Sequence, residues 1–209
     1  YKSLTRDTVY EVFNSRNPLD IASILTKQTI IELDKSMPEN HRILFQEMIL
    51  TWINLYRAFQ GETQELRHVT FMEEFSNMIP KTSQELNSGI ITISSIFKEM
   101  RKFGEGLVIL NQEASELPNY VVANCKTQIH FTSQTKKDII ASASCLNLEK
   151  TEYLDLLGVG HAIVKIKGRF PQLCHVKFNY HPTKTITDEQ LKEIMMQNHP
   201  ELFCTTKNE

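Results

Sequence analysis

Short apolar runs alternate with longer amphipathic segments along this chain, and the alternation predicts strands and helices in turn. Four of the short runs have the length of buried strands. They span Thr29–Asp34, Val69–Glu73, Leu107–Asn111 and Gln128–Ser133. Because helical segments separate these runs, we expect one parallel sheet with helices on both faces, which is an α/β fold.

Capping signals indicate where two of the helices begin. Ser36 and Glu39 have the spacing of a capping box, and the helix that follows them should end near Gly61. The apolar stripe that this helix should bury contains Phe45, Met48, Ile49, Trp52, Ile53, Tyr56 and Phe59. A second capping box, Thr82 and Glu85, opens a helix that should stop at Gly104. Its expected buried residues are Ile93, Phe97, Met100 and Phe103.

The last third of the chain is predicted to hold short helices and a hairpin. The helices are expected at Leu117–Cys125, Lys136–Leu146 and Thr151–Leu157. The hairpin should pair Gly160–Lys167 with Leu173–Phe178, and Thr187 and Gln190 should cap a final helix. Without repeats or a clear linker, we interpret residues 1–209 as a single partial domain. Its core is expected at about 29–133, helices and hairpin at about 134–180, and the terminal helix at about 187–199.

Composition narrows the classes of function. A chain of 209 residues is long enough for one domain with a sizeable core. Its net charge of −2 gives no general attraction to nucleic acid, so a DNA contact would need a local loop or a ring. The four cysteines lack CxxC spacing, which indicates reduced thiols and a cytoplasmic setting. No apolar stretch approaches the roughly 18 residues of a membrane span. A start at Tyr1 without a signal-peptide core is what we expect of a segment of a longer protein.

Two of the predicted strands end in groups that can bind or orient oxygen ligands. Glu73 and Glu74 close one strand, and Gln112 follows another. Ligands of open α/β sheets bind at the carboxyl ends of the strands. One carboxylate could hold Mg²⁺ with a phosphate chain while the other activates a water molecule. Gln112 could hold that water or sense the terminal phosphate, because an amide both donates and accepts. The alternative is that all three are solvated loop residues.

Two arginines are further candidates. Arg101 lies near the end of a predicted helix, off its apolar stripe. From there it could reach the phosphates of a neighbouring subunit as an arginine finger, an interaction worth roughly 10³ to 10⁵ in rate. Its alternative role is a charge that stabilises a helix C-terminus. Arg169, in the predicted hairpin, has the same two interpretations, and the second is favoured. Asp34 is interpreted as a cap or turn residue.

Other catalytic and metal-binding patterns are missing from the sequence. The seven histidines show no HExxH spacing, and no serine lies in a GxSxG elbow. The phosphate-binding pattern GxxxxGK[ST], known as the Walker A loop, is also missing from the 209 residues.

Four motifs resemble the HerA/FtsK superfamily of ring-forming P-loop ATPases, in the order in which that family carries them. Val69–Asn77 resembles its Walker B strand, which often ends in two acids, and Glu99–Leu107 resembles its "RKFG-G-L" segment. Asn111–Pro118 resembles its strand-end glutamine followed by "S-LP", and Asn124–Ile129 is similar to its "NC-T-I" segment. The resemblance covers about Thr29 to Phe178. Glu73 departs from it, since many relatives carry aspartate there.

The resemblance implies a RecA-like parallel sheet flanked by helices, with a C-terminal β-hairpin and helix but without the P-loop strand. In this superfamily that strand lies between the Gln112 strand and the Gln128–Ser133 strand. The P-loop strand would pair with backbone N–H and C=O groups of its two neighbouring strands. Each such group costs on the order of 1 to 3 kcal/mol when it is buried unpaired. We therefore expect the chain to be the C-terminal half of an ATPase domain.

The implied function is part of an ATP-driven DNA translocase or helicase, assembled as a ring, with a hexamer as the expected size. The catalytic set would be Glu74, Gln112 and Arg101. Glu73 would bind Mg²⁺, and Glu73 and Arg169 would contact ATP and its metal. DNA would pass through the ring, and a nuclease or a transfer apparatus could be a partner. The alternatives are a conjugative DNA-transfer ATPase fragment and a non-catalytic interaction module that kept the fold.

Overall fold

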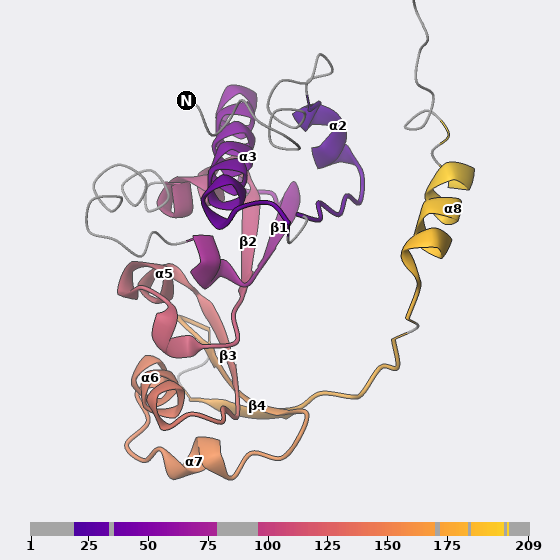
Figure 1. Ribbon diagram of the computed structural model, residues 1–209. Helices are drawn as coiled ribbons and strands as arrows, with labels where there is room; N and C mark the ends of the chain where they lie inside the picture. Colours follow the sequence, from indigo (N-terminus) through magenta and orange to yellow (C-terminus); the bar gives the residue numbers. More distant parts are fainter. Residues whose placement is uncertain are drawn as a thin grey trace, which may run out of the picture. The chain divides into compact units, whose positions relative to one another are not determined.

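The computed structural model describes residues 19–33, 36–78, 96–169, 172–183, 185–198 and 200 (Figure 1). The chain divides into two compact units, residues 1–176 and 177–209. None of the described helices is long and apolar enough to cross a bilayer. The expectation of a single partial domain stays a prediction.

In the described residues of the first unit, two helices come first and are followed by a parallel pair of strands. The elements are α2 (Ile21–Thr26), α3 (Glu39–Gln60), β1 (His68–Glu73), the 3₁₀ turns η1 (Phe75–Met78) and η2 (Met100–Phe103), and β2 (Glu105–Leu110). Strands β1 and β2 run parallel, with His68 beside Glu105 and Glu73 beside Leu110. This register confirms that the Glu73 and Gln112 strands are parallel neighbours.

One face of the β1–β2 sheet is packed into the larger core. Met72, Leu107 and Ile109 point into a cluster formed with Leu50 and Ile53 of α3. The other face carries Phe71 and Val108, which are partners in the register. Phe71 is 68% exposed. Within the described residues this second face is therefore uncovered, although the sequence predicted helices on both faces.

The rest of the first unit is built around an antiparallel sheet. Its elements are η3 (Ala114–Glu116), α5 (Asn119–Asn124), β3 (Thr127–Phe131), α6 (Lys136–Leu146), α7 (Glu152–Asp155), β4 (His161–Ile166) and β5 (Cys174–Lys177). The strand order is β3–β4–β5, and β3 pairs with β4 in antiparallel register. The predicted hairpin and the three predicted short helices are confirmed.

Two of the four predicted parallel strands were wrong. β3 was expected as a parallel strand of the sheet that holds the Gln112 strand, but it belongs to the separate antiparallel sheet, because no described strand lies between them to join the two sheets. Residues 29–33 form no strand, and Ile30 is 95% exposed. An apolar run becomes a strand only when a neighbour pairs with its backbone, and none of the described strands does so here. Asp34 lies outside the described residues.

Helix α3 has the predicted length, and its buried face matches the predicted stripe in part, since Ile53 is buried and Ile49 and Tyr56 pack against the same core. It ends before Gly61 as expected, whereas Pro38 rather than Ser36 occupies the N-cap position. Leu50 and Ile53 are buried, while Phe59 of the predicted stripe is 92% exposed. Two polar side chains, His41 and Arg57, occupy the buried face instead. The Phe59 end of the stripe was misassigned, because Arg57 is buried there through an ion pair with Glu105. Apolar periodicity does not reveal such a pair.

The second predicted capping box, Thr82 and Glu85, lies outside the described residues. The end of that segment is described: Met100 and Phe103 are buried, and Gly104 closes η2 in the left-handed conformation with φ +78°. Gly104 therefore stops the segment where the sequence predicted.

The described part of the second unit consists of an extended segment and the helix α8 (Asp188–Asn198). Thr187 and Gln190 form the predicted capping box. The Thr187 backbone N–H donates to Gln190 Oε1 at 3.1 Å, and the Gln190 backbone N–H donates to Thr187 Oγ1 at 3.3 Å. No described residue of α8 is buried.

Candidate functional site

Glu74 and Gln112 meet at the carboxyl edge of the β1–β2 sheet. The parallel register places Glu73 beside Leu110, so the residues that follow both strands leave the sheet at the same edge. There, Gln112 Nε2 donates a hydrogen bond to Glu74 Oε1. Gln112 is exposed and Glu74 is half-buried, so a molecule in solvent can reach the pair. The sequence prediction placed these two side chains at a common edge, and the structure brings them into contact.

The backbone of Glu74 has an unusual conformation. Its φ is +51°, and the one other described non-glycine residue with a positive φ is Asn147, which ends α6. Asparagine tolerates this region at helix ends, but a glutamate there costs free energy. The next residue, Phe75, is fully buried and packs edge-to-face on Phe97 at 5.3 Å. Burial of Phe75 holds the turn and directs the Glu74 carboxylate towards Gln112.

Asn111 links the two strand ends and was not among the predicted site residues. Its Oδ1 accepts the Ser76 backbone N–H at 2.9 Å, and its Nδ2 donates to the Glu113 carbonyl at 2.6 Å. The turn after β1 and the turn after β2 are thereby bonded to each other. A polar residue at a strand end was the available signal, but its partner 35 residues away could not be deduced from the sequence.

Asp138 supports the segment that follows Gln112 and was not among the predicted site residues; its spacing from Thr135, typical of a helix start, was the available signal. It is buried in the first turn of α6, where its Oδ1 accepts the Ser115 backbone N–H at 3.0 Å and its Oδ2 accepts from Thr135 Oγ1. These hydrogen bonds, first that of Thr135 and then those of Ser115, lower the pKa of Asp138. The carboxylate therefore fixes η3, three residues beyond Gln112, to the start of α6.

Glu73 is exposed and is the last residue of β1. No group of three or more His, Cys, Asp or Glu side chains in the described part of the chain is arranged to hold a metal ion. Mg²⁺ in phosphate-transfer sites usually takes one or two carboxylates and completes its shell with water and substrate phosphates. The exposed carboxylate of Glu73 beside the Glu74–Gln112 pair fits that kind of site.

Arg101 lies at the opposite end of the sheet from Glu74. It is an exposed residue of η2, just before the first residue of β2, Glu105. A strand of six residues extends for about 17 Å, so Arg101 is separated from its own Glu74 by the length of β2. Arg169 is exposed in the turn after β4, in the antiparallel sheet. The structure brings neither arginine to the Glu74–Gln112 pair.

Solved structures with the same fold include several nucleoside triphosphatases. The genome packaging NTPase B204 from Sulfolobus turreted icosahedral virus 2, in complex with AMPPCP, superposes with a TM-score of 0.56 at 17% identity, over 78% of this chain and 73% of that one. VirB4 of Thermoanaerobacter pseudethanolicus gives a TM-score of 0.54 at 16% identity, over 71% of this chain and 40% of that one. This chain has the fold of P-loop ATPases of the FtsK/HerA type.

The bacterial conjugative coupling protein TrwBΔN70 is similar to a lesser degree, with a TM-score of 0.51 at 12% identity, over 65% of this chain and 37% of TrwB. No family model and no curated protein sequence matches this chain. The FtsK/HerA-type fold therefore rests on structural likeness together with the four sequence motifs. It confirms the α/β fold expected from those motifs.

Proposed function

We propose that this chain supplies the Walker B, sensor and arginine-finger residues of a ring-forming, ATP-driven DNA translocase or helicase. The observation that carries the proposal is the hydrogen bond between Gln112 and Glu74 at the carboxyl edge of β1 and β2. Support also comes from the solved structures with this fold, which include a genome packaging NTPase in complex with ATP-gammaS and a conjugative coupling protein.

In this proposal Glu74 takes a proton from the attacking water. A carboxylate accepts hydrogen bonds only, so the oxygen that does not bind Gln112 is free to accept from a water molecule. Gln112 keeps its own amide oxygen and a second N–H, which can orient that water or contact the terminal phosphate. The positive φ of Glu74 suits this role, because residues held in sparsely populated conformations cluster at active sites.

Glu73 would bind Mg²⁺, whose contribution is to neutralise charge on the phosphate chain of ATP. Arg101 would act on a neighbouring subunit, since the length of β2 separates it from Glu74 of its own chain. Its exposure at the amino end of β2 suits a contact between subunits of a ring, and we expect a hexamer. Arg169 would be a further contact to the phosphates, with less support than Arg101.

A non-catalytic interaction module with this fold is the alternative. The observation in its favour is that the 209 residues contain no GxxxxGK[ST] loop. Catalysis therefore requires that a phosphate-binding loop complete the domain. A conjugative DNA-transfer ATPase would use the same Glu74, Gln112 and Arg101, so that alternative changes the pathway and not the chemistry.

The test is a subunit-mixing experiment on the complete domain. Glu74→Gln should abolish turnover but retain nucleotide, because the amide keeps the shape and cannot take a proton. Arg101→Ala should abolish turnover through the neighbouring subunit. In rings mixed from equal amounts of both variants, about a quarter of the interfaces would join an intact Glu74 to an intact Arg101, and activity should return there.

Lys98→Ala is the matched control, since Lys98 is an exposed cation close to Arg101 in the sequence. It should leave turnover unchanged. If mixed rings stay inactive while labelled subunits demonstrably exchange, Arg101 does not act in trans. If Glu74→Gln hydrolyses ATP at the normal rate, the catalytic proposal is wrong and the interaction module takes its place.

A further inference from the structure

A wide hollow of about 660 Å³, largely open to solvent and called the cavity below, lies at the amino end of the β1–β2 sheet, away from Glu74 and Gln112. It is lined by Leu25, Thr26, Arg57, Gln60 and Arg67. Two of these five residues are arginines, which come from the last turn of α3 and from the segment before β1. Nothing in the proposed hydrolysis of ATP uses them.

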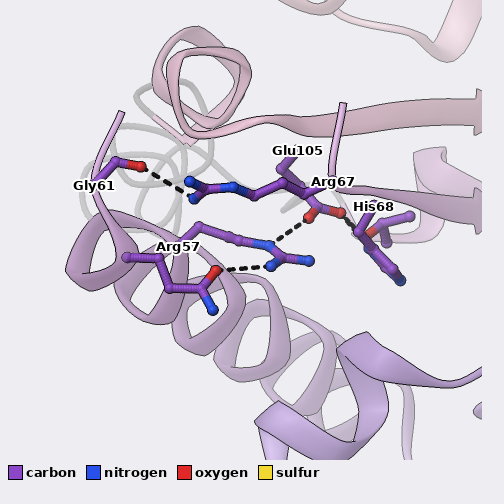
Figure 2. Close-up of polar contacts among 7 residues, drawn as sticks. Arg57, Gly61, Arg67, His68 and Glu105 are labelled. Carbon is purple, nitrogen blue, oxygen red and sulfur yellow. Dashed lines mark hydrogen bonds and ion pairs between the residues drawn. The ribbon is translucent and has the colours of Figure 1, made fainter. Parts of the chain in front are cut away.

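Arg57 is only 5% exposed, and two hydrogen bonds fix its side chain in place. Its Nε donates to Glu105 Oε2 at 3.1 Å, and its Nη1 donates to Gln60 Oε1 at 2.8 Å (Figure 2). Glu105 is itself buried and held on its other oxygen, which accepts from Thr70 Oγ1 at 2.7 Å and lies 2.6 Å from His68 Nδ1. The guanidinium therefore has one orientation before any ligand arrives.

Arg67, which also lines the cavity, is held by hydrogen bonds as well. Its Nη1 donates to the Gly61 carbonyl at 3.1 Å, and its side chain extends across the end of α3 towards Gly61 (Figure 2). Its backbone N–H is bonded to the Gly104 carbonyl at 2.8 Å, which holds the main chain as well. Both arginines thus line one cavity with their side chains already positioned.

Within the described residues, both guanidiniums have N–H groups beyond those that take part in the hydrogen bonds above. Each carries five N–H groups. Arg57 gives two of them to Glu105 and Gln60, and Arg67 gives one to Gly61. In the described part of the chain, Glu105 is the one carboxylate bonded to either arginine, and it pairs with Arg57. The two arginines therefore give the cavity wall a net positive charge. Positioned cationic donors facing an open cavity are the chemistry of an anion site.

We propose that this cavity binds a phosphate group, as free orthophosphate or as part of a small phosphorylated molecule. Two guanidiniums from separate segments line the cavity, and a phosphate has more acceptor oxygens than a carboxylate with which to bind both of them. The cavity is open to solvent and has room for a phosphate group. Leu25 and Thr26 line part of it and can contact the remainder of a phosphorylated molecule.

The test uses the whole chain and three probes: orthophosphate, ribose 5-phosphate and acetate. Binding is followed by calorimetry and by the Nε–H signals of the arginines in ¹H–¹⁵N spectra. We expect orthophosphate to bind with a Kd on the order of 1 mM and to shift the Arg57 and Arg67 signals. Acetate should bind at least tenfold more weakly. Tighter binding of ribose 5-phosphate than of orthophosphate identifies a phosphorylated molecule, and the reverse order identifies the free ion.

Arg67→Gln is the main variant, because Arg67 is exposed and its loss leaves no buried charge unpaired. It should weaken phosphate binding at least tenfold. Arg42→Gln removes an equal charge from α3 outside the cavity and should bind as the wild type does. Arg57→Lys keeps the charge and removes the planar fork, and it should weaken binding without abolishing the ion pair with Glu105.

Three results overturn the proposal: the absence of saturable phosphate binding, equal affinity for acetate, or unchanged binding by Arg67→Gln. The proposal does not depend on ATP hydrolysis, since Glu74→Gln should bind orthophosphate at this cavity as the wild type does.

Discussion

Gln112 donates a hydrogen bond to Glu74 across 38 positions of sequence. The contact exists because β1 and β2 are parallel and in register, so that both strands deliver their following residues to one edge. Buried Phe75 holds one side of the contact, and Asn111 bonds the two turns together. A carboxylate and an amide fixed in this way form a pair that can orient a water molecule.

Loss of the amide should slow turnover without weakening nucleotide binding. In the complete domain, Gln112→Ala removes the group that orients Glu74, and kcat should fall by about 10- to 100-fold with KM nearly unchanged. Steady-state kinetics measure both constants. Glu113→Gln changes the exposed neighbouring side chain and serves as the control. A rise in KM at constant kcat would instead make Gln112 a ground-state binding residue.

The isolated chain should bind ATP weakly and should not hydrolyse it. The 209 residues contain no GxxxxGK[ST] sequence, the pattern whose backbone amides and lysine hold the β- and γ-phosphates. We expect millimolar affinity at best, which corresponds to about 4 kcal/mol of binding free energy. Calorimetric titration checks this, with adenosine as the comparison for contacts that do not involve phosphate. Micromolar binding of ATP would show that the chain holds the phosphates by other means.

Gly104 should be far less tolerant of alanine than Gly61, although both have a positive φ. A Cβ at Gly104 would lie 2.5 Å from the Glu65 carbonyl oxygen and 2.7 Å from Thr63 Cγ2, whereas a Cβ at Gly61 meets nothing within 4 Å. Gly61→Ala therefore costs only what its backbone conformation demands, about 1 to 3 kcal/mol, because φ +84° with ψ 170° is a region that non-glycine residues rarely adopt. Gly104→Ala combines the cost of its left-handed conformation, roughly 1 to 2 kcal/mol, with about 1 to 3 kcal/mol of overpacking. Urea denaturation of both variants measures the difference, and equal losses would contradict the close approach at Gly104.

The sequence predicted local features better than the pairing of distant segments. The bounds of α6, the ends of α3 and η2 at glycines, and the Thr187–Gln190 capping box follow from a few neighbouring residues. The pairing partner of β3 does not, because it depends on which strand is available to bond with it. For the same reason Arg57 was missed: its burial depends on Glu105, 48 residues away.

The support that Asp138 gives to η3 should depend on pH. Hydrogen bonds from Thr135 and Ser115 lower the pKa of Asp138 below its ordinary value of 3.8. The stabilisation from the carboxylate is therefore complete above about pH 4 and is lost as the pH falls through the lower pKa of the folded state. Asp138→Asn cannot ionise, so it should cost about 1 to 3 kcal/mol at pH 7 and progressively less below pH 4.

Denaturant unfolding from pH 2.5 to pH 7 tests the dependence on Asp138. Asp155→Asn is the matched control, because Asp155 is an exposed residue of α7. A difference between wild type and Asp138→Asn that stays constant down to pH 2.5 would contradict the predicted role of the carboxylate charge.

His130 should make the protein less stable below neutral pH. Burial in β3, and secondarily the charge of Lys165, lower the pKa of His130 from its ordinary value of 6.5. Lys165 lies two positions along β4 from Ile163, the partner of His130 in the register, so the two side chains share a face of the sheet. The Lys165 ammonium is held close by, where it donates to the Cys145 carbonyl at 2.7 Å. A proton on His130 therefore meets both a buried setting and a fixed like charge.

The sign of the effect follows from the lowered pKa. The unfolded chain takes up a proton on this histidine near pH 6.5, whereas the folded protein does so only at a lower pH, so stability is complete above 6.5 and falls as the pH drops below it. The slope from one group is at most about 1.4 kcal/mol per pH unit. His130→Gln should remove this slope between pH 6.5 and 5, while His181→Gln, at an exposed position of the second unit, should not. The free energy of unfolding, measured across that pH range for both variants, tests the prediction. If the slope persists in His130→Gln, another group carries the pH dependence. In that case, titration of the His130 ring signals by NMR would show a pKa near 6.5.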